Sequence, residues 1–298
     1  MKESTRGRLR KADEALHLPA VRHQVRQLAG HDQLVEIQAT LERLAAATDA
    51  LHQRLDNLEL VVTEMAKAQG VIDPRNSDYD QWTEVIIRRT LGHGGTGIDV
   101  GAHSGLILRS IVDASPAGPH FAFEPIPGLA AGLRQDFPDV AVHEVALATE
   151  EGEVTFHHVT TNPSYSGIRE RDYTGPEDVE LITVRTARLD ALVPEDADVR
   201  FLKIDVEGAE LGVLQGASGI LERHHPVTVF EFGRGASDHY GTTPKDVHDE
   251  LASHGMVVGL LDRYLEGGDP LDLPELERQY DTGENFYFVA WAPDAADQ

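Results

Sequence analysis

The stretch of this sequence best suited to binding a charged ligand is a glycine turn at residues 101–105. It follows the apolar run Thr96-Gly-Ile-Asp-Val100 and precedes Leu106-Ile-Leu108, where a helix is expected to begin. Glycines at both ends of a turn let a ligand approach the backbone closely. The start of a helix adds free N–H groups and the positive end of the helix dipole. The turn therefore predicts a site for a nucleotide-type ligand.

A carboxylate follows the second predicted strand at the same sheet edge. Glu124 comes directly after Phe121-Ala-Phe123, and a carboxylate at that position can accept hydrogen bonds from both hydroxyls of a ribose. NAD and S-adenosylmethionine (SAM) both carry such a ribose, and both stay open on this feature. The turn lacks the third glycine of a dinucleotide-binding Gly-x-Gly-x-x-Gly, and the last predicted strand is antiparallel. These two features favour SAM.

Two more acidic residues end predicted strands. Asp205 closes the strand predicted at 199–205, and Glu231 lies near the end of the apolar strand predicted at 227–232. A charge in an apolar strand is costly unless it is partnered or functional. We interpret Asp205 as the first candidate for a general base, with His103 or His239 as alternatives, and Glu231 as a second residue facing the substrate. The structural alternatives are a helix cap for Asp205 and local packing for His103.

Strands and helices alternate through the second part of the chain, which predicts an α/β fold with a mainly parallel sheet. The last strand follows an acidic loop, 262–284, without a helix of its own, and is best placed antiparallel beside strand six. The loop 160–178 is a candidate lid, and the segment 233–241 is a candidate wall of the site. The predicted strands are 96–100, 119–124, 140–145, 153–159, 180–186, 199–205, 227–232, 256–261 and 285–292, and the predicted helices are 81–91, 104–114, 127–136, 208–222 and 243–254.

A heptad repeat occupies residues 31–69. Apolar residues alternate at steps of three and four from Leu34 to Met65, with Thr48 as the polar exception. This pattern is typical of a coiled coil, which we expect to self-associate into a homo-oligomer. The alternative is an amphipathic helix folded onto the globular domain. Residues 1–30 are then a flexible or helical tail, 70–80 a linker and 81–298 the catalytic domain.

The charge and the amino-acid composition of the chain limit the kinds of partner and site that we expect. The formal net charge of −25 falls within residues 71–298, because residues 1–70 hold equal numbers of acidic and basic residues. Nucleic-acid binding depends on neutralising phosphates, so DNA or RNA is not the expected substrate. The absence of cysteine excludes disulfides, thiolate zinc sites and a cysteine nucleophile. No apolar run reaches the ~18 residues of a membrane helix, and we expect a cytoplasmic protein without a transmembrane segment.

Several motifs together resemble the FkbM family of SAM-dependent methyltransferases over residues 96–232. The resemblance implies a class I methyltransferase fold, with a seven-stranded, mostly parallel sheet whose last strand is antiparallel. It also implies O-methylation of a hydroxyl on a sugar, glycolipid or glycosylated natural product. The motifs are Ile98-Asp-Val-Gly-Ala-His-Ser-Gly105, Phe123-Glu-Pro125, Val145-Ala-Leu147, Thr186 to Leu192, Lys203-Ile-Asp-Val-Glu-Gly-Ala-Glu210 and Leu214-Gln-Gly-Ala217.

The same resemblance implies roles for particular residues. Asp99, Gly101 and Gly105 would line the methionine part of SAM, and Glu124 would hold its ribose. Val145 and Ala146 would lie against the adenine. His103 stands where family members commonly carry asparagine. The full predicted cofactor set is Asp99, Gly101, Ala102, Gly105, Glu124, Pro125, Val145, Ala146 and Asp205, and the predicted catalytic set is Asp205, His103 and Glu231.

The sequence also offers a candidate metal site and two alternative functions. Asp205, Glu207 and Glu231 can in principle surround Mg²⁺, but an Asp-x-Glu pair is too common to serve as a metal motif. We therefore assign no metal ligand. The alternative functions are an NAD-linked oxidoreductase and a catalytically idle methyltransferase-like scaffold that acts through its coiled coil.

Overall fold

The computed structural model describes residues 73, 75–171, 173 and 175–293. The contacts within the chain divide it into two units, residues 1–77 and 78–298. The second unit contains the α/β fold. The predicted tail and coiled coil, with the expected self-association, lie outside the described residues. Helix α4 (Arg75–Leu91) begins inside the segment 70–80 that was predicted as a linker, six residues before the helix start expected at 81.

One seven-stranded sheet forms the centre of this unit. Its strands are β1 (Thr96–Val100), β2 (Phe121–Phe123), β3 (Ala141–His143), β7 (Val199–Ile204), β8 (Val227–Glu231), β9 (Val257–Gly259) and β10 (Tyr287–Trp291). They lie in the order β3-β2-β1-β7-β8-β10-β9. The neighbours are parallel except around β10, which runs antiparallel to both β8 and β9. This is the sheet of a class I methyltransferase, so the predicted fold and the inserted last strand are confirmed.

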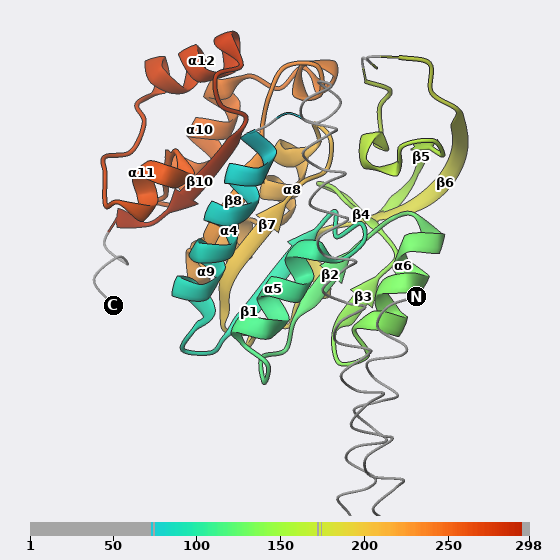
Figure 1. Cartoon of the computed structure of the whole chain (residues 1–298), viewed down its shortest axis with the longest axis horizontal. Coiled ribbons are helices and arrows are strands. Elements are labelled where there is room, and N and C mark those ends of the chain that lie inside the picture. Colours follow the sequence, from blue (N-terminus) through green and yellow to red (C-terminus); the bar gives the residue numbers. More distant parts are fainter. Residues whose placement is uncertain (1–72, 74, 172, 174, 294–298) are drawn as a thin grey trace, which may run out of the picture. The chain divides into compact units, whose positions relative to one another are not determined.

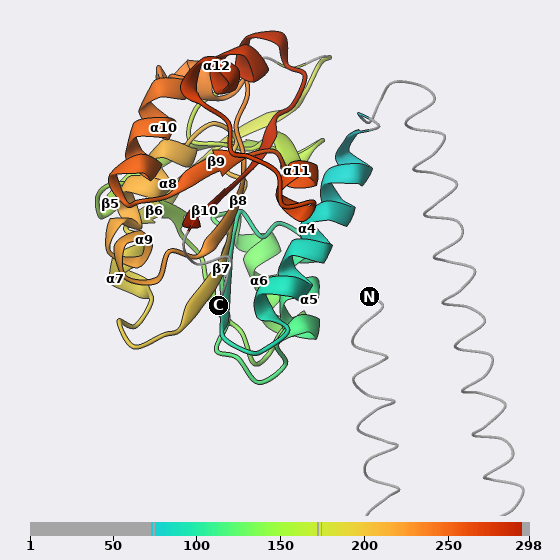
Figure 2. The same ribbon diagram turned by 90° about the vertical axis from the view of Figure 1, so that its left-hand side faces the viewer.

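Helices cover both faces of the sheet, as Figures 1 and 2 show. One face carries α4 together with α5 (Leu106–Ala114), α6 (Pro127–Asp136) and α11 (Leu261–Leu265); the other carries α8 (Glu210–Gly216), α9 (Ser218–His224) and α10 (Pro244–Ser253), with α12 (Leu273–Thr282) beside α10. Strand β1 is buried at every position, because a parallel strand between two helical layers has no face toward water. No helix in the described part is long and apolar enough to cross a membrane.

A smaller sheet extends from the chain between β3 and β7. It contains β4 (Ala146–Leu147), β5 (Gly152–Val159) and β6 (Val179–Ala187) in the order β4-β6-β5. Strands β5 and β6 form the long antiparallel hairpin at the upper right of Figure 1, and the strands predicted at 153–159 and 180–186 are confirmed. The inner side of the hairpin packs on the main domain in an apolar cluster with Ile126 and Ala146.

Two predictions about helices were wrong. The acidic segment 262–284 is not a loop, because it contains the last residues of α11 and all of α12. Its many acidic residues are typical of a solvated loop, but Leu276 and Tyr280 lie one helical turn apart and are both buried. Asp272 accepts a hydrogen bond from the Glu275 N–H and so begins α12. The single helix predicted at 208–222 is broken into α8 and α9.

Candidate functional site

The predicted glycine turn lies directly after β1. Gly101 and Gly105 have φ angles of 77° and 82°, which favour glycine. A Cβ at Gly101 would overlap the carbonyl oxygen of Asp205, and a Cβ at Gly105 would press on Phe137. The turn therefore packs against the chain that follows β7. Ala102 is buried in the apolar cluster beneath α5 and α6.

Glu124 lies at the end of β2 and faces this turn. Its side chain is buried, with Oε2 accepting a hydrogen bond from the His103 N–H at 2.8 Å and Oε1 accepting one from the Ile126 N–H at 2.9 Å. Burial raises the pKa of Glu124 to about 6, although both N–H groups act to lower it. A carboxylate has about four acceptor positions. Both oxygens can therefore still accept hydroxyl groups, and the half-buried Pro125 lies beside them.

Asp99 lies within β1, next to the turn, and has an unsatisfied oxygen. Its side chain is 2% exposed, and its Oδ2 has no hydrogen-bond partner among the described residues. Burial raises the pKa of Asp99 to about 7, while the charge of Lys203 opposes that rise. A buried carboxylate oxygen without a partner is costly. A cationic group bound beside the turn would satisfy it.

Asp205 follows β7 and is held by two side chains. Its Oδ2 accepts hydrogen bonds from Lys203 Nζ at 3.0 Å and from the Tyr287 hydroxyl at 2.6 Å. Lys203 Nζ also lies 4.8 Å from the centroid of the Tyr287 ring. Burial by itself would raise the pKa of Asp205, but Lys203 and the hydrogen bonds from Glu231 and Tyr287 hold it well below its usual range.

Glu231 ends β8 opposite Tyr287 in the antiparallel register with β10. It is half-buried, and one of its carboxylate oxygens lies within 4.8 Å of an oxygen of Asp205. Burial raises the pKa of Glu231 well above its usual range, and the neighbouring negative charge of Asp205 adds to the rise. The structure thus places two of the predicted catalytic residues, Asp205 and Glu231, next to each other.

Glu207 completes a group of three carboxylates. It has a φ of 56° and forms an ion pair with Arg171. Asp205, Glu207 and Glu231 each place an oxygen within 4.8 Å of the other two. However, Lys203 already contacts Asp205, and Arg171 contacts Glu207. Two of the three carboxylates are thus already paired with cationic side chains, and we assign no metal ligand here.

His103 contributes its backbone to the site. Its φ is 46°, and its N–H donates to Glu124. The ring Nε2 is buried and has no partner in the described structure, and burial lowers the pKa of the ring. The other histidine considered, His239, accepts a hydrogen bond at its carbonyl oxygen from Arg169.

The residues predicted to face the adenine are buried in apolar surroundings. Val145 and Ala146 are 4% and 7% exposed. Val145 belongs to the main core, while Ala146 packs with Ile126 and Phe156 beneath the hairpin. Their contact with a cofactor stays a prediction.

The candidate lid and the candidate wall touch each other. Arg169 donates its N–H to the Tyr240 hydroxyl and its Nη1 to the His239 carbonyl oxygen, both at 3.1 Å. Arg171, two residues further on, reaches Glu207. The described part of the loop 160–178 thus lies against the segments that follow both β7 and β8.

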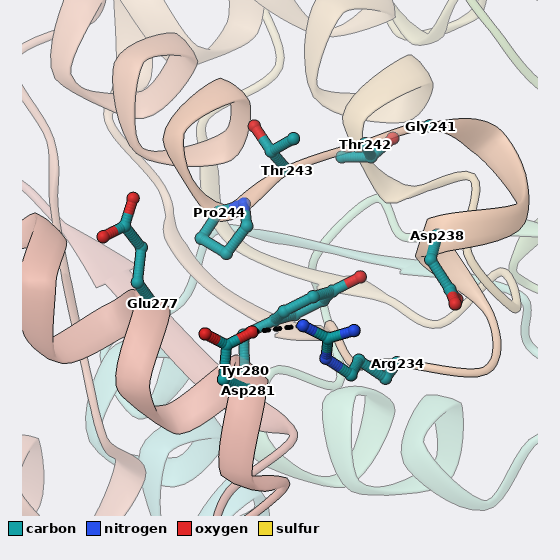
Figure 3. A pocket seen from close by; sticks show the side chains of 9 residues that line it. All are labelled: Arg234, Asp238, Gly241, Thr242, Thr243, Pro244, Glu277, Tyr280 and Asp281. Carbon is teal, nitrogen blue, oxygen red and sulfur yellow. Dashed lines mark hydrogen bonds and ion pairs between the residues drawn. The ribbon is translucent and has the colours of Figure 1, made fainter.

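The other side of the wall segment opens into a separate cavity. This cavity has a volume of about 400 Å³. Arg234 forms an ion pair with Asp281, and its guanidinium lies 5.2 Å from the centroid of the Tyr280 ring (Figure 3). Three of its nine lining residues lie in the candidate wall 233–241, but none is among the predicted catalytic or cofactor-binding residues, so we place the site at the strand ends. The lining residues are Arg234, Asp238, Gly241, Thr242, Thr243, Pro244, Glu277, Tyr280 and Asp281.

Sequence reasoning missed three residues of the site. Lys203 had a usable signal, because residues two apart in a strand share a face and Lys203 is two residues before Asp205. Glu210 is 1% exposed and accepts hydrogen bonds from the Gly208 and Val206 N–H groups, and burial raises its pKa to about 7. Tyr287 lies 82 residues from Asp205. The strand predicted at 285–292 did not indicate that this tyrosine would contact Asp205.

Solved structures of distant similarity include several methyltransferases. A methyltransferase FkbM from Methylobacillus flagellatus KT is 15% identical, with a TM-score of 0.41, and the match covers 66% of this chain and 43% of that chain. A TehB-like SAM-dependent methyltransferase from Corynebacterium glutamicum is 13% identical, with a TM-score of 0.38 and coverages of 83% and 98%. An O-methyltransferase from Bacillus cereus in complex with SAH is 11% identical, with a TM-score of 0.37 and coverages of 78% and 88%.

The family assignment comes from the sequence. No curated protein matches this chain. The family model described as methyltransferase FkbM domain matches residues 99–258, which run from Asp99 in β1 into β9 and include Glu124, Asp205 and Glu231. This chain therefore belongs to the FkbM methyltransferase family.

Proposed function

We propose that this protein is a SAM-dependent O-methyltransferase that acts on a hydroxyl group of a sugar, a glycolipid or a glycosylated natural product. The observation that carries the choice of SAM is the pair of buried carboxylates beside the Gly101 turn. Glu124 keeps acceptor positions for two ribose hydroxyls, and Asp99 has an unsatisfied oxygen for a cation. Membership of the family supports methyl transfer as the reaction.

The residues present fit SAM chemically. SAM supplies a methyl group bonded to a positively charged sulfur. Asp99 would hold its ammonium group and Glu124 its ribose, while Gly101 lets the turn pack closely against the backbone at Asp205. Val145 and Ala146 would lie on the adenine side. An excess of buried carboxylates over cationic side chains at this edge suits a positively charged donor.

Alignment of the acceptor oxygen, the methyl carbon and the sulfur would supply most of the rate enhancement. Holding reacting groups in line recovers ~7–11 kcal/mol of a barrier, whereas a general base gives ~10²–10⁴-fold, or roughly 3–5 kcal/mol. The loops after β7 and β8 and the described part of the loop 160–178 would orient the acceptor. The carboxylates at the ends of β7 and β8 would take the hydroxyl proton.

Ligand binding tests the proposal. Calorimetry on the full chain with SAM, with its demethylated product SAH and with NAD is expected to give heats for the first two alone. Methyl transfer is then measured by mass spectrometry on a panel of p-nitrophenyl glycosides of neutral sugars. NAD binding without SAM binding would favour the oxidoreductase, and SAM binding without transfer to any glycoside would favour the idle scaffold.

Self-association through residues 31–69 is a separate proposal, supported by the heptad pattern. Size-exclusion chromatography of the full chain with light-scattering detection is expected to give a mass of at least twice the 32.6 kDa of one chain. A monomeric mass would leave the amphipathic-helix alternative.

A further inference from the structure

We propose that Lys203 and Tyr287 are positioning residues that hold Asp205 as an anion, so that Glu231 takes up the proton lost by the acceptor hydroxyl. The inference rests on the proposed function and assigns the base within it. The sequence favoured Asp205 as the base. The contacts around the two carboxylates favour the opposite division of roles.

Asp205 is occupied by donors. One oxygen, Oδ2, accepts from both Lys203 Nζ and the Tyr287 hydroxyl. The Lys203 side chain is 4% exposed and that of Asp205 is 29% exposed, so the ammonium group of the pair has little access to water. Hydrogen bonds from an ammonium and a phenol stabilise the ionised carboxylate. Asp205 is therefore a weak proton acceptor.

Glu231 has the opposite surroundings. One of its carboxylate oxygens lies within 4.8 Å of an oxygen of Asp205, and two carboxylates at such a distance cannot both ionise easily. Since Lys203 and Tyr287 hold Asp205 as the anion, the proton of the pair stays on Glu231, whose raised pKa agrees with this arrangement. Glu231 is only half-buried, at the end of β8.

Other charged groups around the pair raise or lower the pKa of Glu231. Lys203 on β7 favours ionisation of Glu231, whereas Glu210 on α8 and Asp205 oppose it. Glu207 lies within the same carboxylate group but is paired with Arg171. The groups that face Asp205 or Tyr287 from neighbouring elements are Asp80 on α4, Asp99 on β1 and His103 in the glycine turn.

In the free protein, Glu231 keeps its proton. A cationic donor favours the ionised form of a nearby carboxylate, so SAM binding releases that proton to water. During transfer the acceptor oxygen forms a bond to the methyl carbon, the carbon–sulfur bond breaks with its electrons on sulfur, and the hydroxyl proton moves to Glu231. SAH leaves with a neutral sulfur, and Glu231 returns to its protonated form.

Carboxyl ¹³C NMR of the full chain, labelled at aspartate or glutamate, tests where the proton lies and needs no acceptor. We expect the glutamate signal that is missing in Glu231→Gln to be protonated at pH 7 and to ionise on addition of SAM; the signal of Glu210, whose pKa burial raises to about 7, should remain in that variant. SAH, with its neutral sulfur, is expected to ionise it less. An Asp205 signal that titrates at or above the usual range of aspartate would overturn the proposal.

Two variants test the positioning roles. Tyr287→Phe removes one hydroxyl, and a lost hydrogen bond to a charged group is expected to move the Asp205 titration up by about one to two pH units. Lys203→Met is expected to move it further. The matched control is Tyr264→Phe on α11, which removes a hydroxyl from a tyrosine that packs on Trp291. If Tyr287→Phe moves the Asp205 signal no more than this control does, Tyr287 has no positioning role.

Kinetics on an acceptor from the glycoside panel separate the two carboxylates. Glu231→Gln should lower kcat at saturating SAM by ~10²–10⁴-fold and abolish the loss of rate at acid pH. Asp205→Asn should keep that acid limb and move it to lower pH, because it removes the charge that raises the pKa of Glu231. The reverse pattern would make Asp205 the base. Absence of SAM binding would instead defeat the proposed function, while the NMR titration would still report on the carboxylate pair.

Discussion

The two halves of the candidate site hold their carboxylates by different means. Beside β1 and β2, Glu124 is held by the backbone N–H groups of His103 and Ile126. Beside β7 and β8, Asp205 is held by the side chains of Lys203 and Tyr287. The first half, which we call the donor half, therefore depends on backbone conformation. The second, the acceptor half, depends on side chains that distant strands bring together. Substitutions should affect the two halves differently.

The largest effect is expected from Gly101→Ala in the donor half. The new Cβ would overlap the Asp205 carbonyl oxygen, and the φ of 77° disfavours alanine. We expect SAM affinity to fall by roughly 100-fold or more, since the backbone must shift where the ligand approaches. Calorimetry measures this loss.

The matched control is Gly132→Ala within α6, where a Cβ meets nothing within 4 Å. It should leave affinity unchanged and stabilise the helix slightly. Affinity in Gly101→Ala within threefold of the parent would show that the donor half does not depend on this backbone turn.

In the acceptor half, Lys203→Met should cost stability. Removing one partner of a buried ion pair costs about 3–5 kcal/mol. We expect the lower end of that range, because the Asp205 side chain is 29% exposed. Urea unfolding measures the change. The double variant Lys203→Met with Asp205→Asn should recover most of it, because it leaves no unpaired charge. A double variant as unstable as the sum of the singles would mean that the two residues are not coupled.

The same contrast explains which parts of the site could be predicted. The donor half could be predicted, because Gly101, Gly105 and Glu124 follow strands that are visible as apolar runs, and glycine itself marks the turn. The mainly parallel sheet also followed from the alternation of elements. The antiparallel placement of the last strand was correct, although it was predicted from the expected lack of a helix before β10, where α12 lies. Asp205 and Glu231 could be placed at strand ends for the same reason.

The contacts that set the roles of these carboxylates could not be predicted. Tyr287 reaches Asp205 only through the register of β10 with β8, and a single sequence does not contain that register. Lys203 was overlooked although its spacing from Asp205 was a usable signal. Helix α12 was missed because its many acidic residues conceal a narrow apolar stripe that includes Leu276 and Tyr280.

A milder effect is expected from Glu124→Gln in the donor half. The amide cannot accept hydrogen bonds from both N–H groups and both ribose hydroxyls, and hydrogen bonds to charged groups contribute about 1.5–3 kcal/mol. SAM affinity should therefore fall by about tenfold or somewhat more, as measured by calorimetry. The matched control is Glu144→Gln, whose exposed carboxylate pairs with Arg134. Equal affinities for the two variants would remove Glu124 from ribose binding.

A smaller effect should appear in the pH dependence of SAM binding. Burial raises the pKa of Asp99 to about 7, and only the ionised carboxylate can pair with an ammonium group. Affinity should therefore fall as the pH drops below 7, by at most about tenfold per pH unit. Calorimetry between pH 5.5 and 8 measures it, and Asp99→Asn should make the profile less steep, leaving the part that comes from the proton released by Glu231. A slope as steep in Asp99→Asn as in the parent would remove Asp99 from this effect.

Treatment with EDTA is expected to leave the rate of methyl transfer unchanged. Lys203 and Arg171 already neutralise two of the three carboxylates that lie close together in the acceptor half. A divalent ion would have to displace these cations, and displacing Lys203 would also remove a donor that holds Asp205 in its ionised form. Methyl transfer after EDTA treatment and gel filtration should equal that of untreated protein, with added Mg²⁺ as the control. A loss that Mg²⁺ restores would mean that the acceptor half is arranged around a metal ion, and the roles given to Lys203 and Glu231 would then have to be reassigned.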